Sequence, residues 1–264
     1  IEQLSIPEVV SIPIAQHIGA PSAPCVQKGD KVKTGQVIAT STGFVSTNIH
    51  SSVSGTVQKI DDIIDASGYK RKAVIIKVDG DEWHESIDTS KDIKKEIILS
   101  SEEIVKKTLE LGIVGLGGAT FPTHVKLSVP KGKTAEILII NGVECEPYLT
   151  SDHRVMLERA EELVVGIQIL MKALNVNRAI IGIENNKPDA IAHLRMVCSS
   201  IPEIKIDALK VQYPQGGEKQ LIKACINREV PSGGLPIDVG AVVHNVGTAL
   251  AVYEAIQKNK PLFE

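Results

Sequence analysis

The chain has 264 residues, of which 43% are hydrophobic and 23% are charged, so it can bury a core and is not a disordered chain. Its length fits one large domain or two ordinary ones. The formal net charge of −3 and the aromatic content of 3% argue against a nucleic-acid-binding protein. No run approaches the roughly 18 consecutive apolar residues of a membrane-spanning helix, so we expect no direct membrane span.

The cysteines and histidines predict no metal site. The four cysteines are far apart, so no Cys-x-x-Cys motif indicates zinc, an iron–sulfur cluster or dithiol chemistry. Sparse cysteines are typical of a reducing, cytosolic compartment. We expect His124, His153 and His244 to be hydrogen-bonded structural residues. The cysteines are Cys25, Cys145, Cys198 and Cys225.

The first part of the chain, residues 6–80, consists of short β-type runs separated by Gly, Pro, Ser and Asp. Examples are Val37–Ala39 and Ala73–Val78, and no helical period is visible. Residues 26–38 and 49–57 repeat one pattern of strand, turn and strand. The sequence therefore predicts an all-β module.

These two repeated pieces resemble the barrel-sandwich fold of biotinyl and lipoyl carrier domains. In those domains the hairpin between the two pieces presents a lysine that carries the prosthetic group. Here that hairpin, Thr40–Val45, contains no lysine. We therefore expect a structural or docking module without a covalent swinging arm. Residues 81–100 are charge-rich and read as a linker, and we place the boundary between domains 1–90 and 91–264 there.

After the linker the pattern changes to alternating helices and strands. Ser100–Glu103 form a capping box at the start of a helix, and Ile137–Ile140 reads as a buried parallel strand. One long helix is expected from Ser151, with Thr150 or Ser151 as its N-cap. Together these elements predict an α/β domain with a mainly parallel sheet. The later elements are a strand at Ala179–Ile183, a helix from Pro188, a strand near Ile204–Val211, and helices near Glu218–Ile226 and Thr248–Gln257.

A glycine-rich segment, Gly112–Lys126, is the first candidate site. Four of the seven residues from Gly112 to Gly118 are glycine, which indicates close approach of the backbone to a phosphate or a flat cofactor. The spacing matches neither Gly-x-Gly-x-x-Gly nor a Walker loop. Lys126 could add a positive charge. The alternative is a tight turn without a ligand.

A second candidate, Asn141–Pro147, directly follows the apolar strand. Ligands in open α/β sheets lie at the carboxyl ends of strands, so Asn141, Glu144 and Glu146 are suited to polar contacts with a ligand. The alternative is a turn that caps the following helix. Cys145 has no neighbouring base and stands between two acids, so we do not expect a nucleophilic thiolate.

Three further segments complete a set of five around one sheet. Tyr213–Lys219 lies at a strand-to-helix junction, where glycines and a helix N-terminus can bind an anion or a cofactor. Pro231–Pro236 and Val242–Thr248 are similarly rich in Gly, Asn and Pro. Such loops are hard to explain as connectors alone.

Taken in order, these segments resemble the RnfC family, the peripheral RnfC subunit of the ion-translocating Rnf electron-transport complex, from Ile6 to Glu264. More distantly, the second half is similar to the NADH-binding flavoprotein subunit of respiratory complex I, which binds FMN and NADH. The most specific segments are Gln16–Pro21, Gly115–Lys126, Asn141–Asp152, Tyr213–Gln220 and Arg228–Gly240.

The resemblance implies a barrel-sandwich module followed by a Rossmann-like domain that binds FMN and NAD(H). Hydride transfer itself requires no general acid or base, so no catalytic side chain is expected. Three positions depart from these patterns: Thr120 stands where both families usually have glycine, and Lys219 and Leu235 stand where the complex I subunit has an acid and an aromatic residue. The resemblance assigns Gly115, Gly117, Gly118 and Lys126 to the FMN phosphate side, Asn141, Glu144, Gly217, Glu218 and Asn245 to the flavin, and Phe121 and Glu146 to the nicotinamide nucleotide.

The function implied by the resemblance is electron transfer between NADH and two four-iron clusters, which we expect on a C-terminal region absent from this chain. Expected partners are the other subunits of an Rnf-type membrane complex. The expected location is peripheral, on the cytoplasmic face of the bacterial cell membrane. Two alternatives stay open: a related flavoprotein of a cobalamin or amino-acid reductase, and a docking module without a cofactor.

Overall fold

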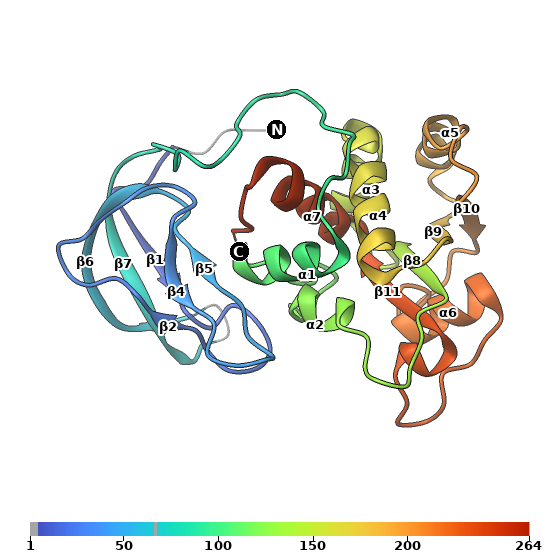
Figure 1. Cartoon of the computed structure of the whole chain (residues 1–264), viewed down its shortest axis with the longest axis horizontal. Coiled ribbons are helices and arrows are strands. Elements are labelled where there is room, and N and C mark those ends of the chain that lie inside the picture. Colours follow the sequence, from blue (N-terminus) through green and yellow to red (C-terminus); the bar gives the residue numbers. More distant parts are fainter. Residues whose placement is uncertain (1–4, 66–67, 264) are drawn as a thin grey trace.

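The computed structural model describes residues 5–65 and 68–263, which form an all-β module followed by an α/β module (Figure 1). In the first module, four strands pair in the order β1-β7-β6-β3 and three in the order β2-β4-β5, with antiparallel neighbours throughout. The strands are β1 (Val9–Pro13), β2 (Ala23–Pro24), β3 (Lys31–Val32), β4 (Val37–Thr40), β5 (Ile49–His50), β6 (Ser54–Ile64) and β7 (Lys70–Gly80).

The core of this module comes from β-branched residues that alternate with polar ones along the strands. Val32, Ile38, Ile49 and Ile76 are almost fully buried between the two sheets. Alternation with a period of two places such residues on one face of each strand. The prediction of an all-β module is therefore confirmed.

The α/β module contains one sheet with the order β10-β9-β8-β11, in which every neighbouring pair is parallel. The prediction of a mainly parallel sheet is confirmed. Its strands are β8 (Ile137–Gly142), β9 (Ala179–Glu184), β10 (Ile204–Leu209) and β11 (Ala241–Asn245). The helices are α1 (Ser101–Glu110), α2 (Thr123–Leu127), α3 (Ser151–Glu158), α4 (Ala160–Leu174), α5 (Pro188–Val197), α6 (Glu218–Ile226), the 3-10 turn η1 (Pro236–Val239) and α7 (Val246–Lys258).

Helices cover both faces of this sheet. Leu138, Ile140 and Ile181 contribute to a core that includes residues of α3, α4, α5 and α7, whereas Ile139 and Ile180 pack with residues of α6 on the other face. Because both faces are covered, the strands read as continuous apolar runs. The predicted capping box is present at α1, where Ser100 and Glu103 exchange hydrogen bonds.

The helix expected to run unbroken from Ser151 is instead two helices, α3 and α4. The chain leaves helical geometry at Arg159, with φ −131° and ψ 33°. The Arg159 guanidinium donates to Glu162 and, at 2.8 Å, to Glu254 on α7. This ion-pair network fixes the junction between the two helices against α7.

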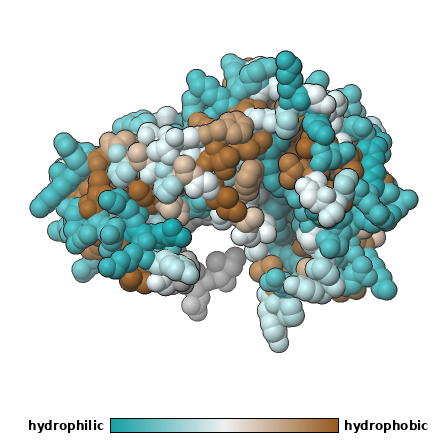
Figure 2. All heavy atoms as spheres, turned by 90° about the horizontal axis from the view of Figure 1, so that it is seen from below, coloured by the Kyte–Doolittle hydropathy of each residue, from teal (hydrophilic) through white to brown (hydrophobic). Residues whose placement is uncertain are grey.

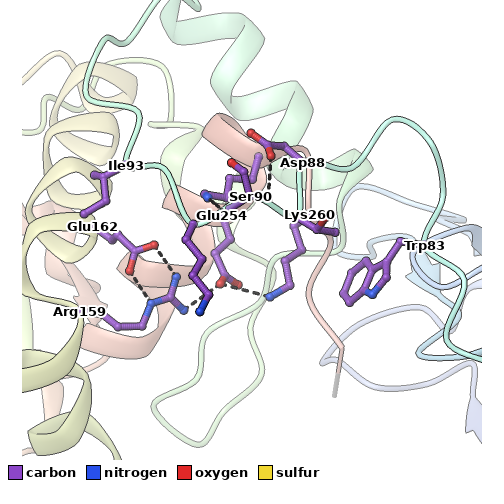
Figure 3. A pocket seen from close by; sticks show the side chains of 11 residues that line it. Trp83, Asp88, Ser90, Ile93, Arg159, Glu162, Glu254 and Lys260 are labelled. Atoms are coloured by element: carbon purple, nitrogen blue, oxygen red, sulfur yellow. Dashed lines mark hydrogen bonds and ion pairs between the residues drawn. The ribbon is translucent and has the colours of Figure 1, made fainter.

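A cavity of about 400 Å³ lies beside this network, at the end of α7 away from Asn245 (Figure 3). Lys260 donates to Glu254 at 3.2 Å and stands over the ring of Trp83, so the charges around the cavity largely neutralise one another. None of the residues that line the cavity belongs to a segment that the sequence predicts to bind a ligand.

Residues 81–100 connect the modules along the outside of the molecule (Figure 1). On the face in Figure 2, apolar residues gather toward the middle, between hydrophilic outer surfaces of the two lobes. Across residues 5–65 and 68–263, no helix combines the length and apolar character needed to cross a bilayer.

Candidate functional site

The carboxyl ends of β8, β9 and β11 meet at one edge of the parallel sheet, where they bring together Asn141, Glu184 and Asn245. Asn141 donates to the carbonyl of Gly216 at 2.9 Å, so it ties the end of β8 to the loop before α6. Asn245 is the N-cap of α7, and its Oδ1 accepts from the amide of Thr248 at 3.2 Å. This edge is where open α/β sheets bind ligands.

The glycine-rich loop approaches this edge from the segment between α1 and α2. The Gly115 amide donates to the Phe121 carbonyl at 2.9 Å, which closes the loop. The Leu116 amide donates to Oγ1 of Thr248 at 2.9 Å, which fastens the loop to α7. A Cβ added to Gly117 would lie 3.5 Å from Cβ of Asn245, so the loop backbone is in contact with the end of β11.

Gly117 and Gly118 are exposed, and their amides donate to no described residue. Gly118 has φ +110° and open space where a Cβ would be, a conformation that favours glycine. Successive backbone amides that have no acceptor among the described residues are suited to binding an anion.

Lys126 on α2 supplies positive charge close to this loop. Its Nζ donates to Oε1 of Glu218 at 2.9 Å and to the carbonyl of Val243 at 3.0 Å. Glu218 is the first residue of α6, and Gly217 is its N-cap without a side-chain hydrogen bond. The structure thus brings Lys126, Gly217 and Glu218 together across the sheet edge.

The two acids of the Asn141–Pro147 segment lie in opposite environments. The Glu144 side chain is 1% exposed, and its carboxylate accepts from the amides of Asp152 at 2.7 Å and His153 at 3.3 Å. It therefore caps α3, although we expected Thr150 or Ser151 to do so. Thr150 occupies the N-cap position but makes no side-chain hydrogen bond there. Glu146, by contrast, is exposed.

A buried charged cluster behind this segment was not predicted. Nζ of Lys187 lies 3.5 Å from a carboxylate oxygen of Glu144 and 3.5 Å from one of Glu184. Oε1 of Glu184 is buried without a hydrogen-bond partner among the described residues. Burial raises the pKa of Asp152 to about 6, and the nearby Glu144 carboxylate acts in the same direction. The only feature of the sequence that could have indicated this cluster is the polar segment between Ile183 and the helix that follows it.

The predicted histidines divide into two groups. His124 donates to the carbonyl of Phe44 at 2.9 Å and His153 lies 2.9 Å from Asp189, so both are hydrogen-bonded as expected. Nε2 of His244 is buried without a partner among the described residues, so the expectation of hydrogen bonding fails at this atom. Burial lowers the pKa of His244 to about 3, which keeps the ring neutral.

The remaining predicted residue, Phe121, is half-buried beside Pro122 and its carbonyl closes the glycine loop. The residues present fit a phosphate-bearing cofactor such as FMN: free amides at Gly117 and Gly118, an ammonium at Lys126 and the N-terminus of α6 lie around one edge. In the described part of the chain no group of three His, Cys, Asp or Glu side chains could hold a metal ion.

Comparison with known protein families agrees with this geometry. Residues 109–254 match the Nuo51 FMN-binding domain, and residues 1–81 match the RnfC barrel sandwich hybrid domain. The whole chain is 51% identical over 265 residues to the C subunit of the proton-translocating ferredoxin:NAD(+) oxidoreductase complex of Clostridium ljungdahlii, covering 100% of this chain and 57% of that protein. The chain belongs to the RnfC family.

A second curated relative and a solved structure are similar to this RnfC-family chain. It is 46% identical over 259 residues to the C subunit of the Na(+)-translocating ferredoxin:NAD(+) oxidoreductase complex of Acetobacterium woodii, covering 98% of this chain and 58% of that protein. The chain thus spans little more than half the length of these relatives. An NAD+-reducing [NiFe]-hydrogenase in the H2-reduced state has a similar fold, with a TM-score of 0.50 and 24% identity over 60% of this chain and 31% of that chain.

Proposed function

We propose that this RnfC-family chain is the FMN- and NAD(H)-binding part of an Rnf-type electron-transport subunit. The supporting observation is the meeting of the free amides of Gly117 and Gly118, the Lys126 ammonium and the start of α6 at the carboxyl edge of the sheet. The match of residues 109–254 to an FMN-binding family supports the same cofactor. The chemistry that FMN would supply in this site is hydride transfer with NADH combined with one-electron transfer.

The residues of the chain would bind and orient this cofactor. Gly115, Gly117, Gly118 and Lys126 would hold the phosphate, because peptide amides and an ammonium are strong donors to an anion. Asn141, fixed by its hydrogen bond to the loop before α6, and Asn245, fixed as the N-cap of α7, would line the flavin.

The other site residues divide by exposure. Glu144 would act indirectly, because its carboxylate is committed to α3 and Lys187. Gly217 and Glu218, at the start of α6, would line the flavin. Exposed Glu146 and half-buried Phe121 would meet the nicotinamide nucleotide.

Wider features of the proposal rest on the relatives, which are named as subunits of ion-translocating complexes. We propose that iron–sulfur clusters on a further region, and other subunits, receive the electrons. A peripheral place on the cytoplasmic face of the membrane follows from the same proposal. We also propose that residues 1–90 and 91–264 are its two domains, divided within the irregular stretch between β7 and α1.

The phosphate contact provides the direct test. Wild-type chain is titrated with FMN and with riboflavin, which lacks the phosphate, and binding is followed by quenching of flavin fluorescence. Lys126→Gln should weaken FMN binding about 10- to 100-fold, the value of a charge-assisted hydrogen bond, and leave riboflavin binding unchanged. Lys133→Gln is the control, because Lys133 also forms an ion pair, with Asp238 at 2.8 Å, but on another loop.

Two results would refute the proposal. If wild-type chain binds no FMN at micromolar concentration, the chain is better described as a docking module. If Lys126→Gln weakens FMN and riboflavin equally, the assigned phosphate position is wrong. Rapid-mixing absorbance of the FMN-loaded chain with NADH then tests the dinucleotide, with bleaching of the flavin band as the expected result.

A further inference from the structure

The N-terminal module contains a conspicuous segment, Gln16–Pro21, that the proposed cofactor site does not use. It lies beside the hairpin whose counterpart in carrier domains bears the prosthetic group. Both segments reach the α/β module on the side of α1 and α2, the side that faces the barrel-sandwich in Figure 1. One of their contacts lies at the end of the glycine loop, and the other lies near the start of α2.

The first contact is at Thr120, at the end of the glycine loop. Thr120 has φ +46°, the left-handed region, which a β-branched residue rarely adopts. Its carbonyl accepts a hydrogen bond from the amide of Ile18 at 3.3 Å. The strained residue of the glycine loop is therefore held by the N-terminal module.

The second contact is at His124, on the helix that carries Lys126. Nε2 of His124 donates to the carbonyl of Phe44 at 2.9 Å, and the two rings meet edge to face with centroids 6.0 Å apart. His124 is 3% exposed, and burial lowers its pKa, which favours the neutral ring. The hairpin tip thus fixes α2 from the side opposite the sheet edge.

The two contacting segments are themselves joined into one unit. The Ala20 amide donates to the carbonyl of Val45 at 2.9 Å, and the Thr47 amide donates to Nε2 of His17 at 3.2 Å. Gly19 lies at φ +111°, and an added Cβ there would lie 2.0 Å from the Val45 carbonyl oxygen. Only glycine allows this close approach of the two segments.

The hairpin is also anchored beside the glycine loop. Oγ1 of Thr47 donates to the carbonyl of Leu109 at 2.7 Å, and Nδ2 of Asn48 donates to the carbonyl of Glu110 at 3.1 Å. Both carbonyls belong to the last turn of α1, and the Leu109 carbonyl also accepts from the amide of Gly112 at 3.3 Å. The N-terminal module therefore caps α1 at the point where the glycine loop begins.

We propose that the barrel-sandwich module is a positioning clamp for the cofactor loop, in which Ile18, Gly19 and Phe44 hold Thr120 and α2 in place for FMN. The effect of the clamp on FMN binding rests on the proposed function, whereas the contacts that form the clamp are present in the chain without any ligand. The hairpin tip that carries a prosthetic group in carrier domains here holds the loop that would bind one.

The test measures hydrogen exchange in the chain without FMN. The probes are the amides of Gly115 and Leu116, which are bonded to Phe121 and Thr248, and amides of β8 are the internal reference. When the N-terminal module no longer holds Thr120 in its left-handed conformation, hydrogen exchange at both probe amides should become roughly tenfold faster. Gly19→Ala should produce this change and leave exchange in β8 unaltered.

A matched glycine controls for backbone strain. Gly29 lies in the same module at φ +95° with open space around it, so Gly29→Ala adds similar strain without touching the hairpin. Phe44→Ala is the milder second variant, because its ring is 66% exposed and its removal leaves the fold intact. It should speed exchange at the probes by a smaller factor, and Phe44→Tyr should restore the wild-type rate.

A further variant tests the role of strain directly. Thr120→Gly removes the cost of the left-handed conformation, so adding Gly19→Ala to it should change exchange at Gly115 less than Gly19→Ala does alone. FMN titration of the same variants should show roughly tenfold weaker binding for Gly19→Ala only where Thr120 is present.

The outcomes separate the two proposals. If Gly19→Ala and Phe44→Ala leave the exchange of the Gly115 and Leu116 amides as in Gly29→Ala, the clamp does not exist. If exchange changes as expected but wild-type chain binds no FMN, the clamp stands and the proposed function fails. If FMN binds with equal affinity to all variants despite faster exchange, the clamp does not serve the cofactor loop and the proposal is wrong.

Discussion

Asp152→Asn should remove a pH-dependent loss of stability that the Asp152 carboxyl causes next to the proposed cofactor site. Asp152 accepts a hydrogen bond from Nδ2 of Asn245 and lies close to Glu144, with the Lys187 ammonium as the nearby positive charge. Burial raises its pKa from 3.8 to about 6, and the hydrogen bond from Asn245 only partly opposes this rise. The charged form is therefore disfavoured in the folded chain.

The sign follows from linkage. A carboxyl whose folded-state pKa lies above its unfolded value contributes stability that is complete below pH 3.8 and is lost as the pH rises through about 6. With 1.36 kcal/mol per pKa unit, the loss accumulated by pH 8 is about 3 kcal/mol, of which about 1.4 kcal/mol is lost between pH 5 and pH 8. Asparagine has no such titration and still accepts from Asn245.

The assay is urea unfolding of the wild-type chain and of Asp152→Asn at pH 5 and pH 8. The free energy of unfolding of wild type is subtracted from that of the variant at each pH, so that the contributions of all groups that titrate in both proteins cancel. The stability of the variant relative to wild type should rise by about 1.4 kcal/mol over this range. Asp238→Asn is the control, since the ion pair with Lys133 lowers the pKa of Asp238 and its effect should be constant above pH 5. A constant difference for Asp152→Asn as well would refute the reasoning.

Two further substitutions test the packing between and within the modules. Burial lowers the pKa of His50 to about 4, so wild type should lose stability as the pH falls from 7 to 4.5, by about 2 to 3 kcal/mol from this group. His50→Leu should remove that part of the loss in thermal melts across the same range, and an unchanged acid slope would contradict it. Gly166→Ala should destabilise the α/β module by about 3 kcal/mol in calorimetry, because the new Cβ would lie 2.1 Å from the Ala249 carbonyl oxygen on α7. Gly43→Ala is the control, because the nearest atom to the added Cβ would be 3.9 Å away, and it should leave the melting temperature unchanged. Equal effects of Gly166→Ala and Gly43→Ala would show that α4 and α7 move apart without cost.

The sequence predicted the fold well because its signals were local. The apolar run Ile137–Ile140, the proline that begins α5 and the capping box at Ser100 each specify an element within a few residues. The break at Arg159 was not predictable, because an apolar period continues from α3 into α4. At the break, Arg159 forms an ion pair with Glu254, which is 95 residues away in the chain and so invisible to a local pattern.

The candidate site was predictable in outline for a similar reason. Parallel strands collect the segments after their carboxyl ends at one edge, so Asn141 and Asn245 had to be neighbours once the sheet was assigned. The cluster of Lys187 with Glu144 and Glu184 was not predicted, because its members come from the segment after β8, the end of β9 and the turn before α5, and only their burial makes them distinctive. The contact of Phe44 with α2 also depends on how the modules meet, which no local pattern encodes.

The contrast between Glu144 and Glu146 bears on how loss of activity in this segment should be interpreted. The two acids are equivalent in the sequence, but the Glu144 carboxylate is buried, caps α3 and faces Lys187, whereas Glu146 is exposed. Removing the Glu144 carboxylate takes away one of the two partners of buried Lys187 and leaves two helix amides unsatisfied, which costs stability whether or not a cofactor binds. Loss of function in Glu144 variants therefore reports on the position of α3. In Glu146 variants no side-chain hydrogen bond or ion pair with a described residue is lost, so an effect there reports on the ligand.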